Sequence, residues 1–293
     1  MTDFGRLMTA MVTPFKKDLS VDHAMAEKLA HFLIQNGTET LVVHGTTGES
    51  PTLTHEEEYE LYRVVVKAVK GKAKVIAGTG SNSTATTIHS TKQAEKIGCD
   101  GAMIVVPYYN RPPQEGLYQH FKTVADNTGL PLIIYNIPSR TGRNMEPETV
   151  VRLAKVKNYF GIKEAAGDLD QVSKIREAAP KEFLIYSGDD NMTIPTMERG
   201  GYGVISVVSH VAGKMVREMV DSFAKGDKAR ALEINKKLEP LYKVLFITTN
   251  PIPVKAALEM IGLPCGIPRL PLIEATEKEK EEIRKVLKEL KLI

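Results

Sequence analysis

The chain has 293 residues, of which 42% are hydrophobic and 26% charged, and its formal net charge is +3. This composition is that of a globular protein and excludes disorder or a fibre, and the length fits either one large α/β barrel or two modest domains. Because the charge is small, with Lys and Arg spread along the chain, we expect small-molecule ligands and no nucleic-acid or membrane partner.

Short apolar runs recur along the chain at fairly even distances, each short enough for a buried strand. They lie at residues 7–12, 41–43, 75–77, 102–106, 132–134, 160–162, 183–185 and 204–205. Between them, apolar residues spaced by three and four predict helices, most clearly at residues 55–70, 84–97, 114–127 and 147–156. Strands that alternate with helices are typically parallel, so these units predict a closed (β/α)8 TIM barrel.

An open doubly wound sheet is the alternative architecture. Against it, no strand is followed by a complete dinucleotide-binding loop, and the nearest segment, residues 78–83, lacks the third glycine. The pattern changes after residue 208, where helical stretches follow at residues 213–225, 227–245, 253–261 and 274–292. We therefore expect a catalytic barrel at residues 1–224 and a C-terminal helical extension at residues 225–293, with the charged run 277–282 as a solvated helix face.

Several features bear on cofactors and location. Cys99 and Cys265 are too few for a disulfide framework and are predicted to be buried thiols. The seven histidines are scattered, so we expect no metal, and no cofactor fingerprint is present. No run reaches the roughly 18 apolar residues of a membrane span, and the first residues lack the regions of a signal peptide. A cytoplasmic location is expected.

Barrel enzymes place their active sites at the carboxyl ends of the strands, which directs attention to Lys163. It closes the apolar run 159–163 and is followed by the small residues Ala165, Ala166 and Gly167. An amine held there can attack a carbonyl carbon to form a Schiff base. Taken alone, the same placement also fits an ordinary solvated lysine past a strand end.

Other polar residues follow neighbouring strands. Thr46 and Thr47 lie in a glycine-rich loop whose hydroxyls and N–H groups can bind a carboxylate, although a capped turn is the plain alternative. Tyr109 follows the fourth strand, where packing or an interface is the commoner use of tyrosine. Tyr135 and Arg140 follow the fifth strand and offer a phenol and a guanidinium suited to carboxylates. This set predicts a Schiff-base aldolase or lyase that acts on a 2-oxo acid.

At these residues the chain resembles the dihydrodipicolinate synthase family, also called the 4-hydroxy-tetrahydrodipicolinate synthase family, within the pyruvate-dependent aldolase superfamily. The resemblance covers nearly the whole chain. It rests on six ordered segments, residues 45–50, 107–112, 135–142, 161–164, 187–190 and 250–253. It implies a lyase that condenses pyruvate with L-aspartate 4-semialdehyde in the diaminopimelate route to lysine, without a cofactor.

The resemblance also implies roles for individual residues. Lys163 would form the imine with pyruvate, and Tyr135 would shuttle protons together with Thr46 and a tyrosine of the neighbouring subunit, which matches Tyr109. Thr47 and the main chain at Ile205 would bind pyruvate, and Arg140 would bind the carboxylate of the semialdehyde. Because the tyrosine comes from another subunit, activity would depend on assembly, and a homotetramer built as a dimer of dimers is expected.

The chain departs from the family pattern at the positions linked to feedback inhibition. Lysine-inhibited relatives bind lysine at a subunit interface, and the matching positions here are Ser50, His55, Asn82 and Tyr108. Inhibited bacterial enzymes commonly carry a histidine and an acid where this chain has Glu58 and Thr86. These departures change charge and size around the site, so we expect weak or absent inhibition by lysine.

Two other functions remain compatible with the sequence. A retro-aldol lyase of the same superfamily, acting on sialic acid or a 2-oxo-3-deoxy sugar acid, would also keep Lys163 and Tyr135. Thr46, Thr47, Tyr109 and Arg140 favour the synthase. A catalytically silent sensor or scaffold is the other alternative, and loss of turnover on replacing Lys163 would distinguish it from an aldolase.

Overall fold

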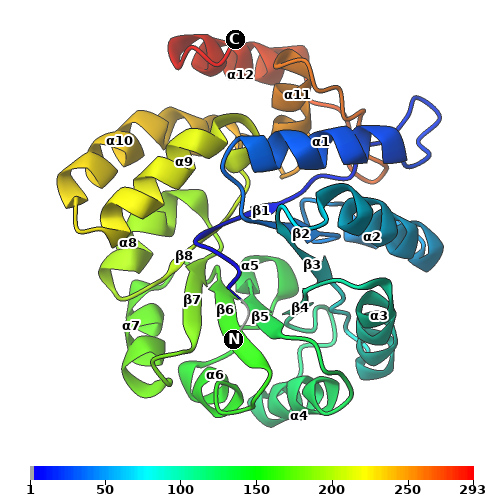
Figure 1. Cartoon of the computed structure of the whole chain (residues 1–293), viewed down its shortest axis with the longest axis vertical. Helices are drawn as coiled ribbons and strands as arrows, with labels where there is room; N and C mark the ends of the chain where they lie inside the picture. Colours follow the sequence, from blue (N-terminus) through cyan, green and yellow to red (C-terminus); the bar gives the residue numbers. More distant parts are fainter. Residues whose placement is uncertain (1–2) are drawn as a thin grey trace.

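The computed structural model describes residues 3–293 and contains a closed barrel of parallel strands in sequence order, with β1 paired to β8 (Figure 1). The predicted barrel is therefore confirmed and the open sheet is wrong. The strands are β1 (Leu7–Ala10), β2 (Thr40–Val43), β3 (Lys74–Gly78), β4 (Gly101–Val105), β5 (Leu132–Asn136), β6 (Tyr159–Glu164), β7 (Leu184–Ser187) and β8 (Gly203–Ser206).

Alternation along the strands separates the barrel interior from the layer beneath the helices. In β5, Ile133 and Tyr135 belong to the interior cluster, whereas Leu132 and Ile134 belong to the cluster packed under the helices. Successive side chains of a strand point to opposite faces, and both faces are buried here. This explains why the strands read as nearly continuous apolar runs, and it fixes which polar residues at strand ends point inward.

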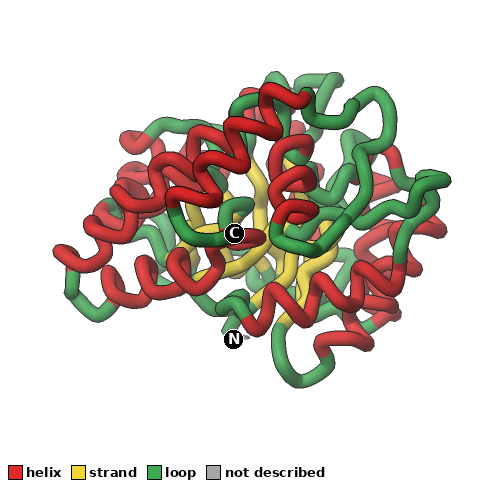
Figure 2. The backbone as a smooth tube through the Cα atoms, turned by 90° about the horizontal axis from the view of Figure 1, so that it is seen from above, coloured by secondary structure: helices red, strands yellow, loops and turns green. Residues whose placement is uncertain are grey.

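Helices surround the strands, as the view from above shows (Figure 2). They are α1 (His23–Gln35), α2 (His55–Val69), α3 (Thr84–Ile97), α4 (Gln114–Ala125), α5 (Pro138–Thr141), α6 (Pro147–Leu153), α7 (Leu169–Ala178), α8 (Thr193–Glu198) and α9 (Ser209–Ala224). Helix α1 was not among the helices singled out from the sequence. Its signals are present, because Asp22 caps its N-terminus and buried apolar residues recur at three- and four-residue spacing.

After the barrel the chain continues as helices α10 (Lys228–Val244), α11 (Ile252–Met260) and α12 (Glu277–Glu289), which Figure 1 shows outside the strand barrel. These helices share one apolar cluster with β8 and α9. The helical extension therefore has no separate core, and the boundary at residue 225 stays a prediction. In α12 only Ile283 and Leu287 are buried, so its charged run is largely exposed to solvent as expected.

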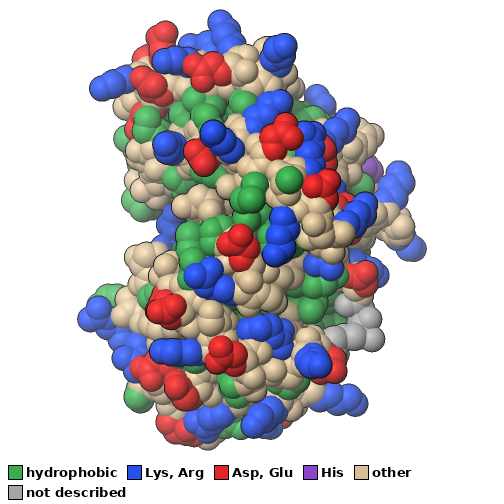
Figure 3. Space-filling view, turned by 90° about the vertical axis from the view of Figure 1, so that its left-hand side faces the viewer, with side chains coloured by type: hydrophobic (Ala, Val, Ile, Leu, Met, Phe, Trp, Pro, Cys, Tyr) green, Lys and Arg blue, Asp and Glu red, His purple; other side chains and the backbone are tan. Residues whose placement is uncertain are grey.

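Two further sequence predictions can be compared with the structure. Cys99 and Cys265 are both buried and free. On the face shown in Figure 3, Lys and Arg side chains are interspersed with Asp and Glu, so this face carries no large area of one charge. Within residues 3–293 no helix combines the length and the apolar character that crossing a membrane requires.

Candidate active site

Lys163 and Tyr135 are neighbours at the carboxyl end of the barrel. They are paired across β5 and β6, and both point inward by strand alternation. Their side chains are 5% and 4% exposed, and Nζ of Lys163 lies 4.3 Å from the centroid of the Tyr135 ring. The structure therefore places an amine against a phenol in a nearly dry environment.

The glycine of the Ser187-Gly188-Asp189-Asp190 segment leaves room for the amine. A Cβ atom at Gly188 would lie 2.6 Å from the Cβ of Ala165 and 3.3 Å from Cε of Lys163. Only glycine fits beside the lysine without a shift of these neighbours. Burial raises the pKa of the Asp189 carboxyl, against the opposite effect of the positive charges of Lys163 and Arg140.

Asp190 connects the ends of two strands. Its carboxylate accepts hydrogen bonds from Ser206 Oγ at 2.5 Å and from the backbone N–H groups of Val207 and Val208 at 2.9 and 3.1 Å. Burial nevertheless raises its pKa, and these hydrogen bonds lower it in part. These bonds fix the end of β8, the strand that carries Ile205, which is fully buried inside the barrel.

The glycine-rich loop after β2 is fixed by buried partners from the C-terminal part of the chain. Thr47 is 3% exposed, and its Oγ1 accepts a hydrogen bond from Nδ2 of Asn250 at 2.9 Å. Glu49, with a left-handed φ of 56°, pairs with Nζ of Lys255 at 2.6 Å. Burial lowers the pKa of Lys255, and the Glu49 carboxylate counteracts this effect. The loop is thus rigid where the carboxylate site is expected.

A cavity of about 240 Å³ opens above these residues. Among its walls are Thr46, Tyr135 and Arg140 of the expected active site, together with Ser50 and Tyr108 of the expected lysine site. Lys163 is not part of the cavity wall and lies against Tyr135 instead. Tyr135 is therefore the residue that the cavity wall and the amine have in common.

Tyr109 does not join this group within one chain. Its side chain is 90% exposed, its backbone has a φ of 72°, and it is not part of the cavity wall. The exposed tyrosine therefore does not line the cavity of its own chain. One chain by itself therefore brings Thr46 and Tyr135 to the cavity and leaves the third member of the expected relay outside.

The remaining residues of the expected lysine site lie away from the cavity. His55 is exposed, and its Nδ1 lies 3.0 Å from the buried carboxylate of Glu58, which also contacts His44 at 3.1 Å and accepts a hydrogen bond from Tyr62. Burial raises the pKa of Glu58, but these contacts outweigh it and leave the pKa lowered. The carboxylate is already fully engaged. The backbone carbonyl of Asn82 accepts a hydrogen bond from Asn110 at 2.9 Å.

Sequence reasoning missed Glu164, which follows the lysine and points outward between helices. Its carboxylate accepts hydrogen bonds from Asn136, Gln171 and the N–H of Ala166 at 2.8 to 3.2 Å. Burial raises its pKa to about 7, and these hydrogen bonds oppose the shift. A carboxylate at an outward position of a buried strand was the available signal. Asn136 follows Tyr135 and Glu164 follows Lys163, so the hydrogen bond between the Asn136 and Glu164 side chains joins the two strands next to the phenol and the amine.

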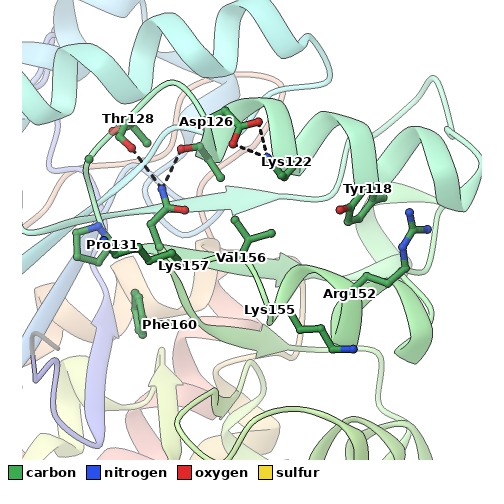
Figure 4. A pocket seen from close by; sticks show the side chains of 13 residues that line it. Tyr118, Lys122, Asp126, Thr128, Pro131, Arg152, Lys155, Val156, Lys157 and Phe160 are labelled. Atoms are coloured by element: carbon green, nitrogen blue, oxygen red, sulfur yellow. Dashed lines mark hydrogen bonds and ion pairs between the residues drawn. The ribbon is translucent and has the colours of Figure 1, made fainter.

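A larger hollow lies at the other end of the barrel and is separate from this site (Figure 4). It has a volume of about 920 Å³ and is formed by the segments that lead into β5 and β6. Three of its charged side chains have local partners, since Lys122 pairs with Asp126 and Arg152 lies over the ring of Tyr118. Within residues 3–293 no cluster of three or more His, Cys, Asp or Glu side chains has the arrangement of a metal site.

Known proteins resemble this chain over nearly its whole length. The model of the dihydrodipicolinate synthetase family matches residues 3–290. The 4-hydroxy-tetrahydrodipicolinate synthase of Moorella thermoacetica is 58% identical over 290 residues, covering 99% of each chain. Among solved structures, dihydrodipicolinate synthase from Bacillus anthracis is 46% identical with a TM-score of 0.96, covering 98% of this chain and 99% of the other. That from Cyanidioschyzon merolae with lysine bound is 47% identical with a TM-score of 0.97, covering 99% of each.

Proposed function

The chain belongs to the dihydrodipicolinate synthetase family, and on that premise we propose which of its residues bind the substrates and move the protons. It is a class I aldolase-type lyase with 4-hydroxy-tetrahydrodipicolinate synthase activity, which condenses pyruvate with L-aspartate 4-semialdehyde through a lysine Schiff base. This reaction belongs to the diaminopimelate route of lysine biosynthesis. The retro-aldol and sensor alternatives are not supported.

Lys163 is the imine-forming residue in this proposal. Its neutral amine attacks the C2 carbonyl of pyruvate, and loss of water leaves an iminium. The iminium draws electrons from the methyl group, which loses a proton to give an enamine, and the enamine attacks the aldehyde carbon. The contact between the buried Nζ of Lys163 and the Tyr135 ring carries this assignment, because it places a phenol that can transfer protons beside the amine that forms the imine.

Substrate carboxylates have two binding positions. We assign the pyruvate carboxylate to Thr47 and the main chain at Ile205, both of which are buried. Arg140 lies on the exposed wall of the cavity, at the helix that follows β5, and would pair with the carboxylate of the semialdehyde. The buried position suits the substrate that binds covalently, and the exposed position suits the one that enters second.

Proton transfer requires a third partner for the phenol. A free phenol is a poor base at neutral pH, so hydrogen bonds from Thr46 and from Tyr109 of a neighbouring subunit would pass the proton onward. The exposure of Tyr109 supports this arrangement. We propose that the protein is a homotetramer, built as a dimer of dimers, in the cytoplasm. Sedimentation and cell fractionation test the assembly and the location.

We further propose that lysine inhibits the enzyme weakly or not at all, through a site at Ser50, His55, Asn82 and Tyr108. The support is that Glu58, which stands where a histidine is common, has its carboxylate engaged by three neighbours and offers little to an incoming ammonium. A solved relative does bind lysine. Steady-state rates with added lysine decide the point, and inhibition at micromolar lysine would overturn it.

Trapping with borohydride tests the imine assignment. Incubation with pyruvate and borohydride should reduce the imine to a stable adduct, and peptide mapping should find it on Lys163 alone. The K163A variant should show no adduct and nearly no turnover, because no other amine occupies that position. The K157A variant is the control, since Lys157 is an exposed lysine at the opposite end of the barrel. An adduct elsewhere, or none on folded protein, would contradict the assignment.

A further inference from the structure

The hydrogen bond between Thr47 and Asn250 joins two segments that are far apart in the sequence. Nδ2 of Asn250 donates to Oγ1 of Thr47 at 2.9 Å, and the two side chains are 5% and 3% exposed. Asn250 lies just before α11, in the part of the chain that follows the barrel. A substrate-binding hydroxyl of the barrel therefore has its partner in the C-terminal helical part.

The direction of this bond determines what the hydroxyl can do. A threonine hydroxyl has one proton to donate and two lone pairs that accept. The amide of Asn250 occupies a lone pair, and among residues 3–293 the hydroxyl has no acceptor for its own proton. The proton is therefore available to an anion. A carboxylate can only accept hydrogen bonds, so it is the complement of a hydroxyl fixed in this way.

The amide is held in place by a second buried contact beside it. Glu49 pairs with Lys255 at 2.6 Å, with side chains 0% and 2% exposed, and the backbone N–H of Arg269 donates to the same carboxylate at 2.8 Å. Thr47 and Glu49 belong to one loop, whereas Asn250 lies just before α11 and Lys255 lies in the first turn of α11. Two contacts therefore connect the same two segments and hold the Asn250 amide at hydrogen-bond distance from the Thr47 hydroxyl.

The other end of the Asn250 amide argues against a purely stabilising role. Its Oδ1 is buried and makes no hydrogen bond to any residue in the described part of the chain. A buried acceptor without a partner costs stability. Stability alone therefore does not explain an asparagine at this position. The group of its side chain that makes a hydrogen bond is the N–H that donates to Thr47.

We infer that Asn250 is a positioning residue for pyruvate, which orients the Thr47 hydroxyl so that its proton points to the substrate carboxylate. This inference rests on the proposed role of Thr47 in carboxylate binding. Asn250 acts through Thr47 and does not itself touch the reacting atoms. The C-terminal helical part thereby contributes to substrate affinity as well as to folding.

Two variants of Asn250 test the inference. The quantity to measure is the half-saturating pyruvate concentration, at which borohydride trapping reaches half of its maximum. In N250A the hydroxyl loses its anchor, and this concentration should rise about 5- to 10-fold. In N250D the carboxylate can only accept, so it should take the Thr47 proton, repel pyruvate and raise the concentration further. The N158A variant is the control, because Asn158 donates to backbone carbonyls at the opposite end of the barrel. It should leave pyruvate binding unchanged.

Thermal unfolding of each variant shows that it is folded. A loss of thermal stability with unchanged half-saturation would make the role of Asn250 structural and overturn the inference, as would an N250D variant that traps pyruvate like the native protein. The maximal turnover number should change less than the half-saturating pyruvate concentration, because the residue acts on binding geometry.

Thr47 variants separate this inference from the proposal on which it depends. T47V alone should raise the half-saturating pyruvate concentration, and no change would remove the proposed role of Thr47. If T47V has its effect, the T47V/N250A double variant should behave like T47V, because the amide has nothing left to orient. Additive effects would show that Asn250 acts independently of the hydroxyl and would overturn the inference alone.

Discussion

At the scale of single residues, the sequence predicted the side chains that point into the barrel better than the buried residues that hold them in place. Lys163 and Tyr135 could be found because each follows an apolar run and carries obvious chemistry. Glu164 and Asn250 could not be assigned a partner, because sequence spacing does not show which side chains meet across 28 or 203 positions. Tyr109 was expected from the resemblance to act in a neighbouring subunit, and the single chain shows only that it is exposed.

The buried Glu164 carboxyl leads to a prediction about pH and stability. Its pKa in the folded protein is raised to about 7, so folding favours its protonated form relative to the unfolded chain. Its stabilising contribution is therefore full below its unfolded pKa and is lost as the pH rises through about 7. The free energy of unfolding of the native protein should fall relative to that of E164Q between about pH 5 and pH 8. Denaturant titrations of both proteins across this range measure the difference.

The E164Q variant keeps the size of the side chain but places an amide among amide donors, so it should be less stable than the native protein below about pH 5. The informative quantity is the difference in slope between the two curves. Parallel curves would show that Glu164 does not titrate in this range. A difference of the opposite sign would show that its folded pKa lies below the unfolded value.

At the scale of elements, periodicity located most strands and helices within a few residues. Helix α3 has the predicted bounds, whereas α6 ends at Leu153, short of the predicted residue 156. Helix α9 begins at Ser209, before the predicted start, and contains a non-helical Ala212 that interrupts its apolar spacing. Short elements such as α5 and α8 carry too few turns for a periodic signal, so only the tertiary structure defines them.

The ion pair between Glu49 and Lys255 connects the loop after β2 to α11 and predicts a specific loss of stability. K255M should lower the free energy of unfolding by about 3–5 kcal/mol, because it leaves the Glu49 carboxylate buried without its partner. The double variant E49M/K255M should recover much of this loss, since no charge is then buried alone. Guanidinium titrations of the single and double variants measure both effects.

A matched control is the exposed pair of Lys122 and Asp126, which should contribute little to stability. K122M should therefore change the free energy of unfolding by less than about 1 kcal/mol. If K255M had an effect as small as K122M, the buried pair would not be a principal connection between these elements.

At the scale of the whole molecule, the shared relay predicts complementation between two inactive variants. K163A lacks the imine amine and Y109F lacks the proposed relay hydroxyl, so each should have little activity alone. In a mixed dimer one active site receives Lys163 from one subunit and Tyr109 from the other. Denaturing and refolding equal amounts together should restore about a quarter of native activity if dimers form at random across a two-fold interface.

Each variant refolded alone serves as the control. If both variants were inactive alone and the mixture regained no activity, Tyr109 would act within its own chain. If Y109F were active alone, Tyr109 would have no role in the relay. A fully active monomer in equilibrium sedimentation would exclude the shared relay as well. The exposure of Tyr109 in the single chain favours complementation.

Closure of the barrel has a consequence for how the protein is made. Strand β1 pairs with β8, whose residues are synthesised almost two hundred positions later. At ~5–20 residues per second, the ribosome needs roughly 10 to 40 seconds to deliver them, and during that time the nascent sheet has two open edges. Edges of this kind invite pairing with other chains, so the growing polypeptide is most vulnerable to aggregation before β8 emerges. Chaperone capture at that stage, followed by rapid release once the last strand docks, is the expected biosynthetic path.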